Sequence, residues 1–477
     1  MSSKFKFGAW LPDQADLDNP GVTEAKNVLP VAGNYLPYAP FKEYGLPGGA
    51  PLPLGLPAGA IRAFTPAQSV VYVASALSGG AGKIYVNNGS PWTDVTPIPS
   101  WAQSNYASWA QYGANVFVAN ALDLPQFAVI GGTSPFTQLT GAFGDAPRAG
   151  VLGIVGQFLV LGNLLASSQP FAVQWSGINA PFDWPTPNSN QAIAEQSGLQ
   201  TLDASLGTVV GITQGDQWGL ILLTGGVVRM TYQGGGVVFS FDTIYRAPGC
   251  LSPDAWCKVG SLIYYLSPAG FFVTDGVSSK SIGYGMVDQY YSSRLNPSQL
   301  NAVRCGVDYA RRLIYWMLPK NGDGPNPQEL LVYNYEEQRW THVFDSVRAF
   351  VNQAQSALLT FGMEAFDETG AKGQFNGSPG VATLISPEME LNPGGKALVS
   401  GIKPQIAGNA VPLTVRVLSR NTTDEALTTT SAVSPTKSTG FADILVENRY
   451  LRAQIDITGP FTQAMGGEFI AQPSGSF

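Results

Sequence analysis

Charged side chains are scarce in this sequence. Asp, Glu, Lys and Arg make up 12% of its 477 residues, where about 25% is usual for a globular protein. The 26 basic and 33 acidic residues leave a net charge of -7, so the chain has no excess of positive charge with which to bind nucleic acid by counterion release. With 44% hydrophobic residues, the composition excludes disorder and favours a surface covered in a permanent assembly.

Histidine and cysteine, on which many catalytic and metal sites depend, are almost absent. His342 is the single histidine, and the aromatic and β-branched residues around it, 338–344, predict a strand with a structural histidine. Cys250, Cys257 and Cys305 are odd in number and lack metal-ligand spacing, so they predict buried free thiols. We therefore expect no enzyme activity, no catalytic residue, no metal site and no cofactor.

Long hydrophobic runs are also missing. The most apolar stretch, 150–166, is interrupted by Gln157, Asn163 and several glycines, so it predicts buried strands and no membrane span. The opening residues, MSSKFKFGAWLPDQ, lack the apolar core and cleavage site of a signal peptide. The sequence therefore predicts a protein that is not exported by the secretory route.

Glycine and proline, by contrast, are abundant, with 55 and 35 residues that punctuate short apolar strands. The clearest unit has strands at 70–73, 83–86 and 92–95, with a hairpin turn at 87–89. Units start near 70, 116, 158, 220, 262, 313 and 357, close to the period of about 40 to 50 residues of four-stranded propeller blades. This predicts an all-β fold with a β-propeller of about six to eight blades over 46–385, and a set of separate β-sandwiches is the alternative.

Two flanks fall outside the repeat. Residues 1–45 carry several prolines and predict an extended N-terminal arm that adds little core and lies on a neighbouring subunit. Residues 386–477 contain alternating runs at 413–418 and 449–457, which predict a small C-terminal β-sandwich-like domain. The only predicted helix is 296–303, with asparagine before proline at its start.

One interval in the repeat is longer than the others. The unit that starts at 158 closes, by its aromatic residues, at 182–184, which leaves 185–205 as an insertion. The insertion opens with the turn-forming residues PTPNSN, so we expect a projecting loop without structure of its own that contacts a neighbour.

Three short motifs fall short of a functional site. Segment 79–84 is rich in glycine but lacks the first glycine and the hydroxyl residue of a phosphate-binding loop, so it predicts a hairpin loop. Asp13, Asp16 and Asp18 resemble a calcium loop but lack its central glycine and bidentate glutamate. The adjacent carboxylates at 336–337 predict a solvated turn.

Several segments together resemble one family. Residues 7–14 (FGAWLPDQ), 17–21 (LDNPG) and 25–30 (AKNVLP) are similar to the openings of tail tubular, or nozzle, proteins of short-tailed bacteriophages and of their packaged-DNA-stabilising relatives. The segments 262–276 and 312–319 resemble propeller blades of the same tail hub proteins. The resemblance extends over about residues 5–345.

The resemblance implies a structural virion protein. Such a protein forms a homo-oligomeric ring, usually a hexamer, below the portal and adaptor, contacts other tail proteins and extends the channel for DNA ejection. It would retain and then release the genome, with transient passage of double-stranded DNA, in a virion made in the host bacterial cytoplasm. Two alternatives remain: a protein-scaffold propeller, and a glycan-binding propeller in which Trp101, Trp109 or Trp175 stacks on sugars.

Overall fold

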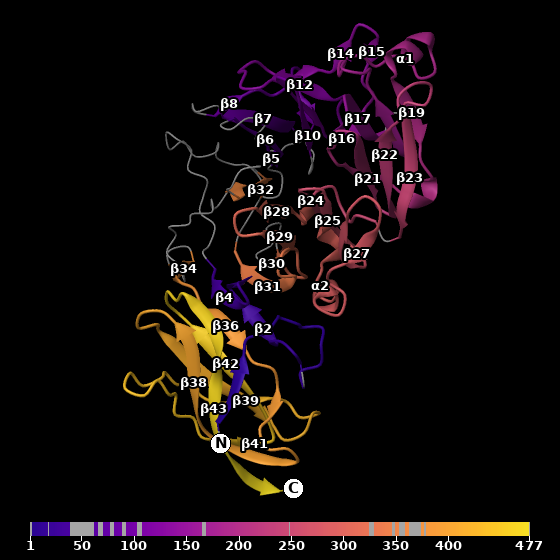
Figure 1. Ribbon diagram of the computed structural model, residues 1–477. Helices are drawn as coiled ribbons and strands as arrows, with labels where there is room; N and C mark the ends of the chain where they lie inside the picture. The colour runs from indigo at the N-terminus through magenta and orange to yellow at the C-terminus, as the bar shows by residue number, and fades with distance from the viewer. Residues whose placement is uncertain are drawn as a thin grey trace.

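The computed structural model is an all-β chain whose strands form small antiparallel sheets (Figure 1). Two short helices, α1 (Asn190–Glu195) and α2 (Asp288–Ser292), and two 3-10 turns, Ala204–Leu206 and Pro297–Ala302, accompany the strands. None of the helices in the described part of the chain has the length and apolar character that a membrane span needs. The structure describes residues 2–17, 19–38, 62–64, 70–76, 81–87, 92–102, 107–164, 168–247, 249–323, 329–345, 349–352, 358–361, 374–375 and 378–476.

Five sheets of four or five strands, followed by the first four strands of a ten-stranded sheet, succeed one another between residues 62 and 344, and each is one propeller blade. The first three blades consist of β5 (Arg62–Phe64), β6 (Val71–Ala76), β7 (Ala81–Asn87), β8 (Thr93–Asp94) and β9 (Trp101–Ala102); β10 (Ser108–Tyr112), β11 (Asn115–Ala119), β12 (Gln126–Val129) and β13 (Thr137–Gln138); and β16 (Ala149–Val155), β17 (Phe158–Leu164), β18 (Gln169–Trp175) and β19 (Gly198–Thr201). The next three consist of β20 (Val209–Ile212), β21 (Trp218–Leu223), β22 (Gly226–Tyr232) and β23 (Phe239–Arg246); β24 (Trp256–Val259), β25 (Leu262–Ser267), β26 (Gly270–Thr274) and β27 (Ser279–Ser281); and β28 (Cys305–Asp308), β29 (Leu313–Leu318), β30 (Glu329–Asn334) and β31 (Arg339–Phe344).

The blades are arranged around a common centre. The first strands of successive blades lie against one another, β10 beside β16, β16 beside β20 and β24 beside β28. A hairpin of β32 (Ala349–Asn352) and β33 (Leu358–Phe361) lies between β28 and β5, where it bridges the last blade and the first. The chain is therefore a β-propeller, and the predicted fold class is confirmed. Two smaller hairpins are β14 (Thr140–Gly141) with β15 (Gly144–Asp145), and β34 (Gln374–Phe375) with β35 (Ser378–Pro379).

The predicted repeat is correct in spacing but displaced by one strand. The predicted unit starts at 158, 262 and 313 are the first residues of β17, β25 and β29, which are the second strands of their blades. These second strands are packed on both faces, and β29 is buried at every residue. A strand buried on both faces reads as a continuous apolar run, so it marks each unit more strongly than the strand before it.

The predicted insertion 185–205 is ordered in a way that the sequence does not indicate. It contains helix α1 and then β19, which pairs with β18 as the outer strand of the third blade. The predicted closing segment, 182–184, is not a strand. The expectation of a loop without structure of its own is therefore wrong, because the fourth strand of the blade lies after the helix and not before it.

The start of α1 is defined by one side chain. The hydroxyl of Ser189 accepts a hydrogen bond from the backbone N–H of Ala192 at 3.1 Å. Losing such a cap costs about 1 kcal/mol, so we expect Ser189→Ala to speed amide exchange within 190–196 about fivefold. Hydrogen exchange with mass spectrometry measures this rate, and unchanged exchange in that peptide would contradict the capping role.

The predicted helix 296–303 is present as a 3-10 turn. Asn296 accepts a hydrogen bond from the N–H of Ser298, and Pro297 is the first residue of the turn, as the sequence predicts. Gln299 has non-helical backbone angles, so the segment does not continue as an α-helix. Both α-helices were missed because each is too short, six and five residues, to show a helical period.

The two termini together form a β-sandwich. One sheet holds β1 (Ser2–Lys6), β3 (Val28–Val31), β4 (Asn34–Pro37), β38 (Gly395–Ala407), β41 (Val446–Asn448) and β43 (Gln463–Ser476). The facing strands are β2 (Glu24–Lys26), β36 (Ala382–Ile385), β37 (Met389–Glu390), β39 (Leu413–Arg420), β40 (Thr428–Thr429) and β42 (Tyr450–Ile457).

The N-terminal arm is extended, but it lies on its own chain. β1 and β4 both pair with β43, and Phe5, Trp10 and Tyr35 are buried in the largest hydrophobic core. The expectation that this segment adds little core is therefore wrong. The sequence does not indicate these core residues, because prolines and short strands leave no stretch of the segment with the alternation of a complete strand. Residues 39–45 of the predicted arm lie outside the described residues.

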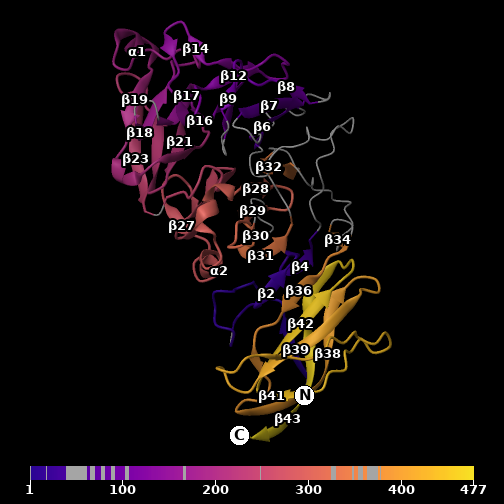
Figure 2. The ribbon, with the colours of Figure 1, turned by 180° about the vertical axis from the view of Figure 1, so that it is seen from behind.

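A single sheet joins the propeller to the sandwich. β31, the outer strand of the sixth blade, pairs in parallel with β2, and β2 pairs with β36 of the sandwich. Figure 2 shows β2 and β4 between the sixth blade and the sandwich strands, as Figure 1 does from the opposite side. The N-terminal segment is thus the connection between the two domains.

Candidate functional site

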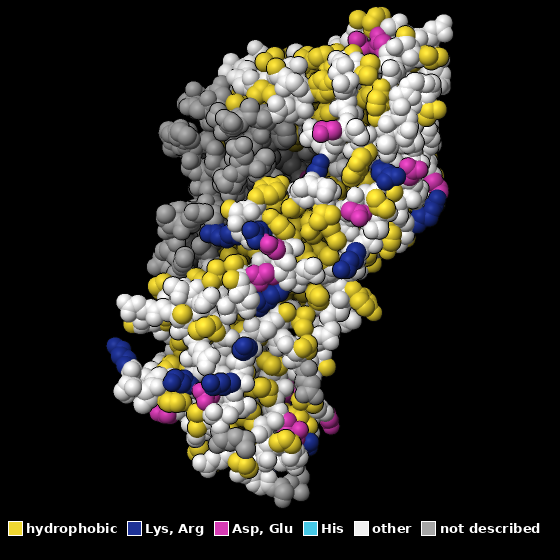
Figure 3. Space-filling model, in the orientation of Figure 1, with side chains coloured by type: hydrophobic (Ala, Val, Ile, Leu, Met, Phe, Trp, Pro, Cys, Tyr) yellow, Lys and Arg dark blue, Asp and Glu magenta, His cyan; other side chains and the backbone are white. Residues whose placement is uncertain are grey.

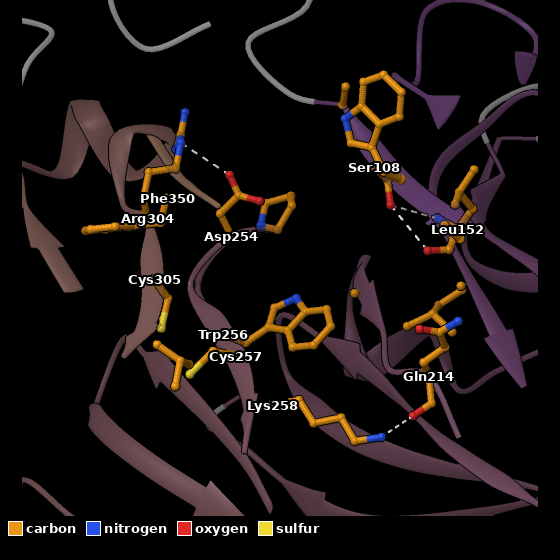
Figure 4. A pocket seen from close by; sticks show the side chains of 18 of the residues that line it. Ser108, Leu152, Gln214, Asp254, Trp256, Cys257, Lys258, Arg304, Cys305 and Phe350 are labelled. Atoms are coloured by element: carbon orange, nitrogen blue, oxygen red, sulfur yellow. Dashed lines mark hydrogen bonds and ion pairs between the residues drawn. The ribbon is translucent and has the colours of Figure 1, made fainter. Parts of the chain in front are cut away.

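Among the described residues, polar side chains gather at the centre of the propeller and at the junction with the sandwich. The centre holds a cavity of about 360 Å³ lined by first strands of successive blades (Figure 4). Asp254 and Arg304 form an ion pair at 3.2 Å there, and the ammonium group of Lys258 donates a hydrogen bond to the carbonyl of Gln214. Trp256 extends its indole between these two groups.

The central cavity has the size of a small-molecule site and not of a nucleic-acid channel. Its volume lies at the low end of the roughly 300–1,000 Å³ of ligand pockets. Burial lowers the pKa of Arg304 to about 10, so the guanidinium stays charged at neutral pH. The described charges in the cavity are therefore mixed in sign and partly neutralise each other.

The three cysteines are buried free thiols, as the sequence predicts. Cys257 and Cys305 line the central cavity. Burial raises the pKa of Cys250 to about 12 and that of Cys305 well above its ordinary value. Because the thiolate is the reactive form, Cys250 and Cys305 are not activated nucleophiles.

The second place is a cluster around His342, where β31 meets β2. The Nδ1 of His342 lies 2.8 Å from a carboxylate oxygen of Glu329, and its Nε2 contacts a carboxylate oxygen of Glu24. Lys320 binds the other oxygen of Glu329 at 3.0 Å. The hydroxyl of Tyr290 donates to Glu329 at 2.6 Å. Three elements far apart in sequence thus converge on one imidazole.

Trp10 encloses the histidine from the N-terminal side. Its ring stacks on that of His342 at 4.7 Å and 11°, and it is fully buried. His342 itself is in strand β31, which confirms the predicted strand, and its side chain is only 4% exposed. The sequence showed no sign of Glu24, Glu329 or Tyr290 as partners.

The electrostatics of the cluster favour a charged histidine. Desolvation pulls the pKa of His342 down, but hydrogen bonds and charges of Glu24 and Glu329 outweigh it and raise that pKa above its ordinary value. Desolvation of Glu329 is likewise outweighed by His342, Tyr290 and Lys320, which bring the pKa of Glu329 to about 2. The cluster therefore holds two carboxylates around one imidazolium.

The aspartates of the calcium-like segment have structural roles. The carboxylate of Asp13 accepts hydrogen bonds from the backbone N–H groups of Gln289 and Tyr290, both at 2.8 Å, at the start of α2. Asp16 forms an ion pair with Arg452 at 2.6 Å. Asp18 lies outside the described residues. Among the residues that the structure does describe, no group of three His, Cys, Asp or Glu side chains could hold a metal ion.

The residues that carry the N-terminal resemblance fold into a compact loop. Gly21 fits because a Cβ there would lie 1.8 Å from the carbonyl oxygen of Ala9. Asn19 accepts a hydrogen bond from the N–H of Gly21 and donates one to the carbonyl of Leu11. This loop carries Trp10 and Asp13 to the junction, so these motif residues serve the connection between the domains.

Two of the three tryptophans considered for sugar stacking are buried. Trp101 and Trp175 are only 3% and 7% exposed, and Trp109 lines the central cavity. The phosphate-loop candidate lies partly in strand β7, with 79–80 outside the described residues. Glu336 and Glu337 lie at the turn before β31, where Glu336 pairs with Arg312.

The described surface shows no continuous basic stripe in the view of Figure 3, where charged side chains lie singly or in small groups of mixed sign among hydrophobic and neutral ones. Large apolar side chains are also exposed singly. The most exposed are Tyr284, Ile98, Leu445, Ile193 and Val277.

Comparisons with known proteins add little. No protein-family model matches the chain. No curated protein matches its sequence. Among solved structures it is similar to YCF48 bound to a D1 peptide, at a TM-score of 0.39 and 11% identity, over 68% of this chain and 99% of that one. The assignment of the propeller fold rests on the pairing and order of the strands described above.

Proposed function

We propose that the chain is a structural virion protein, a subunit of the tail nozzle or hub of a short-tailed bacteriophage. In this role it extends the channel for DNA ejection and helps to retain and then release the genome. The proposal starts from the resemblance of 7–14, 17–21 and 25–30 to nozzle proteins. It includes no enzymatic step.

One structural observation supports the proposal in addition to the resemblance. The residues similar to the nozzle family build the joint between propeller and sandwich, through β2 and the loop of Trp10 and Asp13. A sheet that runs through both domains holds them in one orientation. Identical subunits close into a ring only if each presents the same two surfaces at a constant angle, so a stiff joint suits a ring subunit.

The proposed partners follow from the same role. The protein would assemble in the bacterial cytoplasm as a homo-oligomer, a hexamer in this family, and bind the portal, the adaptor and other tail proteins. Double-stranded DNA would pass between subunits, because the propeller cavity of about 360 Å³ is far too small for it. A net charge of -7 disfavours adhesion of the passing DNA.

Native mass spectrometry and negative-stain microscopy of the purified protein test the proposal, alone and with the portal and adaptor proteins of the same phage. We expect a closed ring that binds the adaptor complex end to end. If the protein stays monomeric, both alone and with the portal and adaptor proteins, the result would favour a scaffold propeller. Binding on a glycan array, with no ring formed, would favour the glycan-binding alternative.

A further inference from the structure

We propose that His342 is a removable ionic cross-link between the propeller and the sandwich, which adds to the strand pairing at the joint only while its imidazole carries two protons. The inference concerns the joint within one chain and does not depend on the tail assignment. It rests on the geometry of the imidazole and its two carboxylates.

Both ring nitrogens of His342 face carboxylates. Nδ1 lies 2.8 Å from Glu329 on β30, and Nε2 contacts Glu24 on β2. A neutral imidazole has one N–H and one lone pair, so it can donate to only one of the two. Only the imidazolium donates to both carboxylates, whereas a neutral ring with its proton on Nε2 keeps the bond to Glu24 and leaves Nδ1 to accept from the Tyr290 hydroxyl, 3.2 Å away.

The two carboxylates belong to different domains. Glu329 is in the sixth blade, while Glu24 is on the strand that pairs with β36 of the sandwich. The Glu329 side of the site is nearly closed to water, since the side chains of His342 and Glu329 are 4% and 2% exposed, whereas Glu24 is 29% exposed. Loss of the proton therefore removes one of the two charge-assisted hydrogen bonds, and with it the ionic link between Glu329 and Glu24.

The other charged groups around the ring do not replace the lost proton. Lys320 is bound to Glu329 and lies over the ring of Phe344 at 4.9 Å, and Lys26 lies over the same ring at 4.5 Å. From α2, Tyr290 donates to Glu329, and Arg294 stacks on the ring of Tyr290 at 3.6 Å. None of these contacts spans from Glu329 to Glu24 as the imidazolium does.

The direction of the pH effect follows from the pKa shifts. The pKa of His342 is raised in the folded chain, so its contribution is complete below about 6.5 and is lost as the pH rises through the folded value. The pKa of Glu329 falls to about 2, so its contribution is complete above about 4.3 and is lost only in strong acid. A rise in pH through the folded pKa of His342, and not mild acid, opens the cross-link.

The single histidine allows a direct test in the intact protein. Exchange of the imidazole C2 hydrogen, followed by mass spectrometry between pH 5 and pH 10, reports the protonation midpoint of His342 alone. We expect a midpoint above about 6.5. Amide exchange in β2 and β36, corrected for its intrinsic pH dependence, should rise at least about tenfold through the same midpoint.

Matched variants separate the cross-link from general stability. Glu24→Gln should lower the midpoint by about one unit or more. Glu336→Gln, an exposed carboxylate at the turn before β31, should leave it unchanged. His342→Gln should make amide exchange at the joint independent of pH in this range. A wild-type midpoint at or below about 6.5, or exchange at the joint that does not follow the midpoint, would overturn the proposal without any variant.

Discussion

Deletion of residues 2–37 is expected to unfold the C-terminal sandwich while the propeller blades stay folded. The deletion removes β1 and β4 from β43, which leaves this 14-residue strand paired on one side only. It also removes Phe5, Phe7, Trp10 and Tyr35 from the shared core. Truncating one such buried aromatic costs about 3 to 5 kcal/mol. The deletion removes four of them, so its cost is comparable to the total free energy of unfolding of a domain, about 5 to 15 kcal/mol.

Limited proteolysis with mass spectrometry checks this result. Residues 380–476 should become protease-sensitive in the truncated chain, while 107–345 stay resistant. A synthetic peptide of residues 2–37, added in trans, should restore resistance and serves as the control. A truncated chain whose sandwich stays resistant would mean that the segment stabilises something other than its own chain.

Replacement of Glu388 by alanine should produce the second largest effect. Its carboxylate is fully buried and binds Arg420 through both oxygens, at 2.9 and 2.5 Å, and Arg452 at 3.4 Å. Arg452 also pairs with Asp16, so the network ties the N-terminal segment to the sandwich. Removing one partner of a buried ion pair leaves uncompensated charge and costs about 3 to 5 kcal/mol.

Glu390→Ala is the matched control. Glu390 pairs with Arg449 only two residues from Glu388, but the two side chains of that pair are 27% and 32% exposed. An exposed pair contributes about 0 to 1 kcal/mol. Urea unfolding monitored in the sandwich should separate the two variants clearly, and equal losses of stability would contradict the role of the buried network.

The junction also shows which contacts cannot be predicted from local patterns in the sequence. His342 was predicted to be structural because its local strand is apolar and aromatic, and that interpretation needs only neighbouring residues. Its partner Glu24 lies 318 positions away, in a segment predicted to be an extended arm on a neighbouring subunit. No periodicity connects two such positions, so the ionic cross-link and the position of the arm were beyond any local pattern.

By itself the sequence determined the all-β class, the spacing of the blades and the sandwich strands near the C-terminus, because alternation and turn residues act over a few positions. It also determined the buried thiols, since three isolated cysteines have no metal-ligand spacing. Only the tertiary structure decided that β1 to β4 complete the sandwich and that β2 extends the sixth blade. The pairing of strands hundreds of residues apart is decided by which edges and faces meet after the chain has closed, and that information is distributed over the whole fold.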